Sequence, residues 1–419
     1  MSASNELAKV SGPISLYYSD NHNDMQQSQP VTYDSRFRSG FQTLGAGLQV
    51  VQIPVDGGLS RCCLVFGFDA GALDDLSAND LMPKSWGYQA LESLTWRVAG
   101  SSEYRLTGAQ LLAKNLRLAT NSGTKEAIYS LGGSEVLGST PDAQYAFIPL
   151  PLWSMPDNGG FASPVAGDLL AQQVQIRVQM RAPKDFMFSV PLSGSVPVAA
   201  VNPPALYSVG YFQAEFLRLV DRAQSIAPKV QEDTYVDPLP CDFDQSELSL
   251  VLPAGSSPNT PLTFSGLIFG QTKMLQVFLT SNDPADAANQ GIFVAPASIE
   301  MTFAGTVYAT YQNFSSRIWN IMDGTAPSSV NANYRAIESG AWNTAGISTL
   351  SEYVNLPLSQ PISNDHATEI QVNGMNISNG SVTLNITSPD VTKAWTVHVI
   401  PVLRGALSYS RGSANILIG

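Results

Sequence analysis

Tyr145-Ala-Phe-Ile-Pro-Leu-Pro-Leu-Trp153 is the segment from which the architecture of this chain can be worked out. Every residue from Phe147 to Trp153 is apolar, which predicts burial on both faces. Pro149 and Pro151 lie two residues apart, so in an extended chain both missing N–H groups fall on the same side. A strand without donors along one side belongs at the edge of a sheet. The sequence therefore predicts a buried edge strand, with Phe147 and Trp153 filling the core of its domain.

A turn and an amphipathic strand follow this segment. Asp157-Asn-Gly-Gly160 consists largely of residues that tolerate positive φ, and it is predicted to reverse the chain. From Val174 to Met180, apolar side chains alternate with Gln and Arg, which is the period of a half-buried strand. An edge strand that leads into an amphipathic strand is typical of a β-sandwich.

The composition favours an all-β fold with two cores. The chain has 419 residues, enough for two cores of roughly 200 residues each. Only 13% of the residues are charged and 44% are hydrophobic, which excludes a disordered protein. The 33 Gly and 27 Pro are scattered, as expected for many short elements joined by turns. The net charge of −12, without clusters of Lys or Arg, argues against direct contact with nucleic acid.

Polarity, proline content and periodicity divide the chain into parts. The prediction is an N-terminal arm at 1–35, a first domain at 36–220, a proline-containing linker at 221–240 and a second domain at 241–419. Strands are expected at 48–54, 62–68, 91–98, 174–180, 248–252, 267–269, 274–279, 299–303, 381–386 and 394–400, and a short helix is expected at 111–116. The last two strands alternate cleanly and are expected to form a pair.

Several landmarks occur in an order that resembles one family of virus proteins. The segment 147–153, the Gly-containing turn and the strand ending at Arg181 are similar to the signature of the double jelly-roll major capsid proteins. That family belongs to large double-stranded DNA viruses of eukaryotes, such as the iridoviruses and phycodnaviruses. Other landmarks of the family occur in the expected order before and after this segment, at Gly87-Tyr88, Glu92, Gly100, Thr107-Gly108 and Asp221-Arg222. The resemblance covers residues 36–419 as ordered landmarks and not as close identity.

The resemblance carries expectations about fold and function. It implies two tandem jelly-roll β-sandwiches with short helices in the connections. It also implies a structural protein without enzymatic activity, a homotrimer that forms a pseudo-hexameric capsomer in an icosahedral virion shell. Neighbouring capsomers, minor capsid or penton proteins and an internal membrane beneath the shell are the implied partners, with no direct nucleic acid. The implied location is the capsid shell, after synthesis and assembly in the host cytoplasm.

Two other functions remain open at the level of sequence. A protein of the same fold can act as a transient virus scaffold, which would be absent from mature particles. A two-jelly-roll carbohydrate-active or glycan-binding enzyme would need paired carboxylates near an aromatic side chain. It would also need a secretory signal, and the opening residues Met1-Ser-Ala-Ser-Asn-Glu lack the features of one.

No residue is assigned a catalytic, cofactor-binding or metal-binding role. The histidines His22, His366 and His398 do not have metal-ligand spacing, and His398 is expected at a solvated rim, on the same strand face as Thr396. Asp242-Phe-Asp-Gln-Ser-Glu247 begins like a calcium loop but lacks the glycine and the final acid that shape such a site.

The remaining acidic, aromatic and sulfur-containing residues have structural interpretations. Acidic residues around one loop are expected to be solvated; they are Asp69, Asp74, Asp75 and Asp80. The tryptophans are expected in cores, except Trp342 in a Gly- and Ser-rich loop. Cys62, Cys63 and Cys241 are predicted to be free thiols in a reducing cytosol. The sequons are then predicted to stay unmodified; they lie at Asn313, Asn376, Asn379 and Asn385.

Overall fold

A computed structural model gives the structure of this chain. It describes residues 35–40, 47–53, 58–97, 103–118, 122–134, 136–137, 142–151, 165–166, 174–189, 198–217, 239–245, 247–255, 260–265, 271–283, 291, 293–303, 305–312, 353–358, 375–376, 381–410 and 413–418. Nearly all of the expected arm, most of the expected linker, the turn at 157–160 and the expected strand at 267–269 lie outside these ranges.

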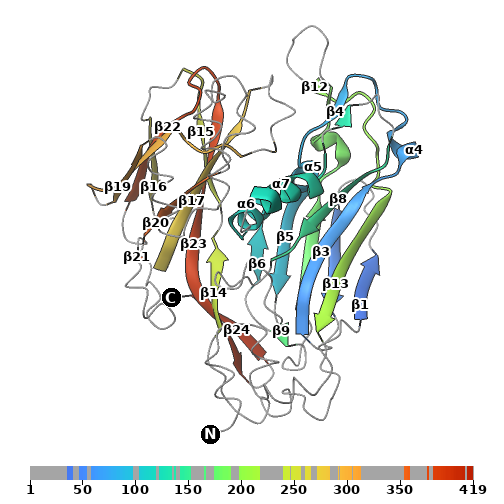
Figure 1. Ribbon diagram of the computed structural model, residues 1–419, viewed down its shortest axis with the longest axis horizontal. Helices are drawn as coiled ribbons and strands as arrows, with labels where there is room; N and C mark the ends of the chain where they lie inside the picture. The colour runs from blue at the N-terminus through green and yellow to red at the C-terminus, as the bar shows by residue number, and fades with distance from the viewer. Residues whose placement is uncertain are drawn as a thin grey trace.

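The first half of the chain forms a sandwich of two antiparallel sheets (Figure 1). Sheet A has the order β1 (Ser35–Gly40), β13 (Val209–Leu217), β3 (Gly58–Phe68) and β8 (Gln144–Pro149), and β9 (Val165–Ala166) also pairs with β3. Sheet B has the order β2 (Gly47–Ile53), β10 (Val174–Met180), β5 (Leu91–Arg97) and β6 (Tyr104–Leu106). A small sheet C lies at one end, in the order β12 (Val198–Ala199), β11 (Phe188–Ser189), β4 (Asp80–Met82) and β7 (Val136–Leu137).

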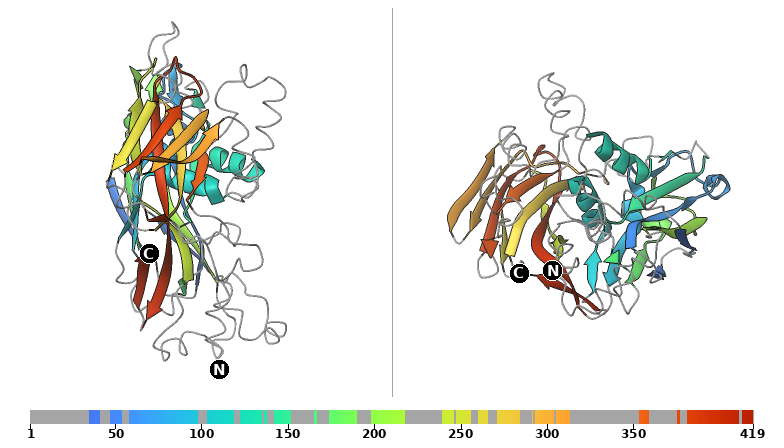
Figure 2. Two further views of the ribbon diagram at one scale, coloured as in Figure 1. Left: turned by 90° about the vertical axis from the view of Figure 1, so that its left-hand side faces the viewer. Right: turned by 60° about the horizontal axis from the view of Figure 1, so that its bottom comes forward.

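The helices of the described ranges all belong to this first half. They are α4 (Ala70–Leu73), α5 (Trp86–Ala90), α6 (Gly108–Leu118), α7 (Ser122–Leu131) and the 3-10 helix η3 (Pro183–Asp185). The expected helix at 111–116 is confirmed as the centre of α6. Figures 1 and 2 show α6 between the two halves of the molecule.

The second half contributes two more antiparallel sheets. Sheet D has the order β14 (Leu239–Asp244), β23 (Trp395–Ser410), β17 (Gln271–Ser281) and β20 (Val354–Pro357). Three further strands join sheet D: β15 (Leu248–Leu252) and β24 (Ser413–Ile418) pair with β23, and β21 (Met375–Asn376) pairs with β17. Sheet E has the order β16 (Thr260–Ser265), β22 (Ser381–Thr387), β18 (Ser298–Phe303) and β19 (Thr306–Gln312). Among the described strands, none from the first half shares a sheet with one from the second.

Strand β8 lies at the edge of sheet A, as its prolines predict. Its one partner in the described part of sheet A is β3. The N–H of Leu150 donates to the carbonyl of Cys62 at 3.0 Å, so the nitrogens of Pro149 and Pro151 face away from β3. The missing donors therefore cost sheet A no hydrogen bond.

The prediction that Phe147 fills the core is wrong. Ala146 and Ile148 are fully buried. Ala146 packs closely against α5, since a β-carbon added at Gly87 would lie only 2.4 Å from the β-carbon of Ala146. Phe147 points to the opposite face of β8, where its side chain is 41% exposed. An apolar run does not show which face of its strand the interior covers. Trp153 lies outside the described residues.

Buried apolar side chains form two core clusters. One fills the first sandwich and extends to side chains of the second half, namely Phe243, Phe278, Phe293, Tyr353, Ile400 and Leu403, and the other fills the second sandwich. Trp86 stacks on Phe186 in the first core, with ring centroids 6.0 Å apart, and meets Phe66 edge-on at 5.8 Å. Trp96 lies in the same core and Trp395 lies in the second, each almost completely buried. These three tryptophans confirm the expected core packing.

The expected pairing of 381–386 with 394–400 is wrong. The first segment forms β22 in sheet E, and the second forms the start of β23 in sheet D. The connection at 388–394 therefore crosses between the two layers of the sandwich. Alternation shows that both strands are half-buried, but both layers of a sandwich give the same alternation.

Candidate functional site

A set of polar contacts joins α6 of the first half to sheet D of the second half. We call this set the joint. Its residues are Thr107, Gln110 and Arg117 on the side of α6, and Asp244, Gln245, Glu247, Gln276, Thr280, Tyr353 and His398 on the side of sheet D.

Both faces of sheet D are covered, and the face toward α6 carries polar side chains that bond to the helix. One face packs into the second core through side chains of β17 and β23, namely Val277, Leu279, Val397 and Val399. The alternate positions of the same strands face α6 and include Gln276, Phe278, Thr280 and His398. Gln276 is fully buried, so its amide needs partners on the helix.

The N-terminus of α6 is capped by a capping box, and the two side chains of this box also bond to residues on the side of sheet D. The N–H of Thr107 donates to Gln110 Oε1 at 2.9 Å, and the N–H of Gln110 donates to Thr107 Oγ1 at 3.1 Å. The Thr107 hydroxyl then donates to Glu247 Oε2 at 3.1 Å, and Gln110 Nε2 donates to the carbonyl of Gln245. A carboxylate at the N-terminus of a helix also interacts favourably with the helix dipole.

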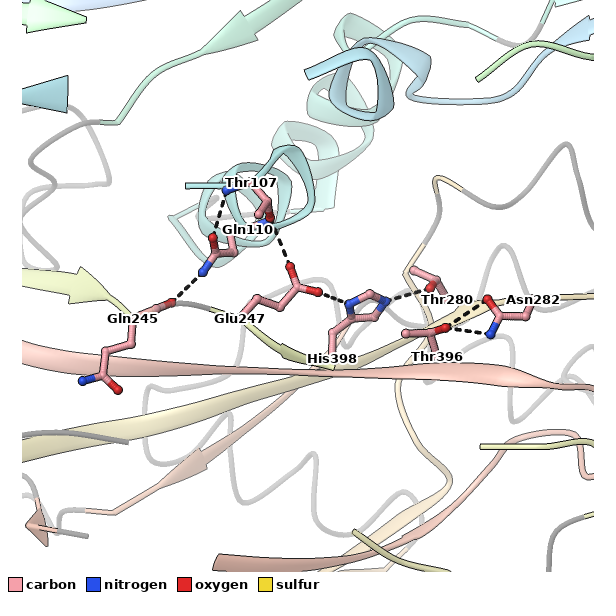
Figure 3. A network of polar contacts seen from close by, with 8 residues as sticks. All are labelled: Thr107, Gln110, Gln245, Glu247, Thr280, Asn282, Thr396 and His398. Atoms are coloured by element: carbon pink, nitrogen blue, oxygen red, sulfur yellow. Dashed lines mark hydrogen bonds and ion pairs between the residues drawn. The ribbon is translucent and has the colours of Figure 1, made fainter. Parts of the chain in front are cut away.

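His398 holds Glu247 in this position (Figure 3). Its Nδ1 contacts Glu247 Oε1, its Nε2 lies 2.8 Å from Thr280 Oγ1, and its ring stacks on Phe278 with centroids 4.8 Å apart. The side chains of His398 and Glu247 are only 11% and 13% exposed. The expectation of a solvated histidine is therefore wrong, because α6 covers this face of β23.

A buried ion pair fixes the other end of α6. Arg117 lies 2.6 Å from Asp244 Oδ1 and donates to Gln276 Oε1 at 2.7 Å. The side chains of Arg117 and Asp244 are 8% and 0% exposed. Gln276 Nε2 and the Tyr353 hydroxyl donate to main-chain carbonyls of α6, each at 3.1 Å. The helix is thus bound to sheet D at both of its ends.

Comparison with solved structures identifies the arrangement of the four large sheets. The chain superposes on a model of the PBCV-1 virus capsid with a TM-score of 0.55 and 12% identity, over 92% of this chain and 97% of that one. For the major capsid protein of mavirus the TM-score is 0.54 and the identity is 9%, over 98% of this chain and 95% of that one. For the Faustovirus major capsid protein the TM-score is 0.51 and the identity is 8%, over 92% of this chain and 90% of that one. The chain has the double jelly-roll fold. No protein-family model and no curated protein sequence matches it.

Sheets A to C with their helices are the first roll, and sheets D and E are the second roll. In these terms the joint lies between the rolls. The expected all-β fold of two jelly rolls with short helices in the connections is confirmed. Within the described ranges, no helix is long and apolar enough to cross a membrane.

The joint contains a hydroxyl, an imidazole and a carboxylate in the order of a hydrolytic triad, namely Thr280, His398 and Glu247. Such triads attack a substrate that sits in a cavity beside the hydroxyl. Here the second carboxylate oxygen already binds Thr107, and the imidazole lies flat on Phe278. These contacts tie the trio to the N-terminus of α6 and to sheet D. The geometry supports positioning of α6 as the role of these residues.

Two opposing effects set the charge of Glu247. Burial acts to raise the pKa of this carboxyl, but the contacts with His398 and Thr107 outweigh it and hold the pKa below its ordinary value of 4.5. A carboxyl whose pKa is lower in the folded state stabilises the fold above its unfolded pKa. That contribution disappears as the pH falls through the lower, folded value.

We therefore expect Glu247→Gln to lower the free energy of unfolding at pH 7 by about 2 kcal/mol, because the amide loses the charge-assisted bonds. The difference between the two proteins should shrink as the pH falls from 4.5, where the unfolded carboxyl takes up its proton, and should vanish below the lower pKa of the folded carboxyl. Urea unfolding followed over this pH range measures it. Glu300→Gln is the control, since Glu300 is half-buried and accepts a bond from Asn385 outside the joint. A difference that does not change with pH would contradict this role of Glu247.

The acidic segments identified in the sequence have structural roles. Asp244 and Glu247, from the calcium-like segment, both serve the joint, and no group of metal-ligating side chains occurs in the described ranges. Asp80 is not solvated as expected; it is fully buried and accepts N–H bonds from Ser77 and Val201. Burial alone would raise its pKa, but these bonds hold the pKa below its usual range.

The expectations for the acidic loop and for two of the cysteines are confirmed, and several others concern residues that the structure does not describe. Three members of the acidic loop are exposed as expected, namely Asp69, Asp74 and Asp75. Cys62 and Cys63 are not joined in a disulfide, as predicted. His22, His366, Trp342 and the side chain of Cys241 lie outside the described residues.

Sequence reasoning missed the joint itself. One local signal for it was present: Thr107 and Gln110 form the spacing of a capping box directly before an apolar helix. A second signal is Arg117, a charged residue in the last turn of a mostly apolar helix. Polar residues on an otherwise buried helix indicate polar partners on the element that covers it.

Proposed function

We propose that this chain is a structural capsid protein, which forms homotrimeric, pseudo-hexameric capsomers of an icosahedral virion shell. The fold supports this proposal. Structures that share it over 92% to 98% of this chain include a PBCV-1 capsid and the major capsid proteins of mavirus and Faustovirus. No enzymatic activity is part of the proposal.

The joint is the observation that carries the proposal. A capsomer made of three chains has six roll-shaped lobes, and its outline stays regular only if the two rolls of each chain keep a fixed angle. Buried polar contacts at both ends of α6, including the Arg117–Asp244 pair, supply such a fixed connection. Polar contacts are directional, so they define an orientation that apolar packing alone leaves adjustable.

The proposal extends to domains, partners and location. The boundaries proposed are an arm at 1–35, rolls at 36–220 and 241–419, and a linker at 221–240. The proposed partners are neighbouring capsomers, minor capsid or penton proteins and an internal membrane beneath the shell. The net charge of −12 supports a shell without direct contact with the genome. The proposed location is the virion, after assembly in the host cytoplasm.

Electron microscopy of the purified protein tests the capsomer. Class averages viewed along the symmetry axis should show six lobes around a threefold axis. Averages with two lobes, at concentrations where assembly is complete, would contradict the proposal and favour a protein that acts as a single chain.

Phe147 gives a test of how copies meet. Its exposed ring lies on the outer face of an edge strand, and we place the contact between copies of the chain at this strand. We expect Phe147→Ser to raise the dissociation constant of the oligomer about tenfold, while the unfolding free energy of the subunit changes by less than about 0.5 kcal/mol. Sedimentation over a concentration series measures the first quantity.

Val391→Ser is the matched control for Phe147. Val391 is 43% exposed, close to the 41% of Phe147, but it lies in the turn between β22 and β23. The control should leave the oligomer unchanged. Equal effects of the two substitutions would show that loss of exposed apolar surface, and not the position of Phe147, caused the change.

A further inference from the structure

An open groove lies at the end of the first roll that is remote from β9 and β24 (Figure 1). It has a volume of about 840 Å³ and runs between α4 and the segment 201–208. On the side of α4 it is lined by Gly71, Ala72 and Asp75. None of them belongs to the joint or to β8.

The wall formed by 201–208 is held in place at both ends. The N–H of Val201 donates to the buried carboxylate of Asp80 at 3.1 Å, and the N–H of Ser208 donates to the carbonyl of Gly67 at 2.9 Å. Tyr207 adds a further anchor beside the second end, since its hydroxyl donates to the carbonyl of Arg181 at 2.6 Å. Its ring also stacks on that of Phe68, with centroids 5.2 Å apart.

Two consecutive prolines further restrict this wall. Pro203 and Pro204 each have a fixed φ, so the segment loses little conformational entropy when a ligand binds. The groove is therefore formed before any ligand arrives.

The chemistry of the groove combines exposed apolar groups with negative charge. Val201 and Leu206 are 65% and 45% exposed. Asp75 lines the groove, and the exposed Asp69 and Asp74 flank α4. No lysine or arginine is among the described residues that line it.

This combination fits an extended peptide better than a small molecule. A small-molecule site encloses most of its ligand. Here the apolar side chains stand exposed at the rim, which suits a segment that lies across them and places one apolar side chain between Val201 and Leu206. The carboxylate of Asp75 favours a cationic residue next to that side chain.

We propose that this groove binds an extended segment of another protein, in which an aliphatic side chain is flanked by Lys or Arg. Its position at the end of the roll leaves the outer faces of sheets A and E free for contacts between copies. Binding in the groove is therefore compatible with assembly, and it does not depend on the proposed capsid function.

The test uses the full-length protein and a phage library of random short peptides. The enriched peptide is synthesised with a fluorescent label, and its binding is measured by anisotropy. We expect enrichment of sequences with an aliphatic residue beside Lys or Arg. The double substitution Val201→Ser and Leu206→Ser should weaken binding about tenfold, and Asp75→Asn about threefold. Circular dichroism confirms that each variant is folded.

The control is Leu48→Ser with Val50→Ser, which removes two aliphatic side chains of similar exposure, 57% and 54%, from β2. It should bind the peptide like the wild type. The proposal is overturned if no peptide is enriched, if the enriched peptides are acidic, or if the groove variant binds as well as the control. An enriched sequence that matches a stretch of this chain would assign the groove to a second copy and also overturn it. The oligomeric mass, measured separately, reports on the capsid proposal alone.

Discussion

Replacement of Arg117 by alanine is expected to lower the free energy of unfolding by about 3 to 5 kcal/mol. The substitution leaves Asp244 as an unpaired charge whose side chain is 0% exposed. It also removes the donor to Gln276 Oε1, a second buried group. The cost is therefore mainly that of charge and polarity left behind in the interior, and not the strength of the lost pair itself.

The effect should concentrate at the connection between the rolls. Trp86 and Trp96 lie in the first core and Trp395 lies in the second, so the change in tryptophan fluorescence on chemical unfolding includes both rolls. We expect the variant to unfold in two separated transitions, because the rolls lose a contact that couples them. Unfolding in one transition at the wild-type midpoint would contradict this account of the joint.

A second ion pair provides the matched control for Arg117. Arg177 and Glu103 lie 2.8 Å apart on the outside of sheet B, with side chains 39% and 45% exposed. Solvent screens such a pair, so Arg177→Ala should cost less than about 1 kcal/mol. The comparison separates the effect of burial from the effect of removing an arginine.

Gly108→Ala is expected to destabilise the chain by about 3 kcal/mol, with the effect directed at the start of α6. A β-carbon at Gly108 would lie 1.9 Å from the carbonyl oxygen of Tyr88 and 2.6 Å from that of Leu91. Both obstacles are main-chain atoms, so α6 has to move away from α5 and β5. That movement also withdraws the capping box from Glu247 on sheet D. Thermal unfolding by calorimetry measures the loss.

Gly71 in α4 is the control for Gly108. A β-carbon there would meet no atom within 4 Å. Gly71→Ala should leave stability unchanged or raise it by up to about 1 kcal/mol, since alanine favours helix more than glycine does. If both substitutions had the same effect, close approach of α6 to α5 would not be what Gly108 provides.

Features that depend on local chemistry were predictable from the sequence. Pro149 and Pro151 predict an edge strand correctly, because a missing N–H has the same consequence in any fold. The alternation from Val174 to Met180 predicts the inward and outward faces of β10, with Ile176 and Val178 fully buried. The two-roll architecture was predicted from the order of the landmarks that this chain shares with the capsid family.

Features that depend on which layers meet were not predictable. Phe147 and His398 were assigned to the wrong environments for opposite reasons. The interior covers only one face of β8, which leaves Phe147 outside, whereas α6 covers a face of β23 that alternation alone assigns to solvent. Glu247 likewise looked like part of a weak calcium motif, since its partners His398 and Thr107 are distant in sequence.

The oligomeric mass of the purified full-length chain, measured by native mass spectrometry, tests the central proposal most directly. The proposed capsomer predicts a dominant species of three chains, which dissociates more readily in the Phe147→Ser variant. A dominant monomer at concentrations well above those needed for capsid assembly would contradict the proposal, even though the double jelly-roll fold would stand.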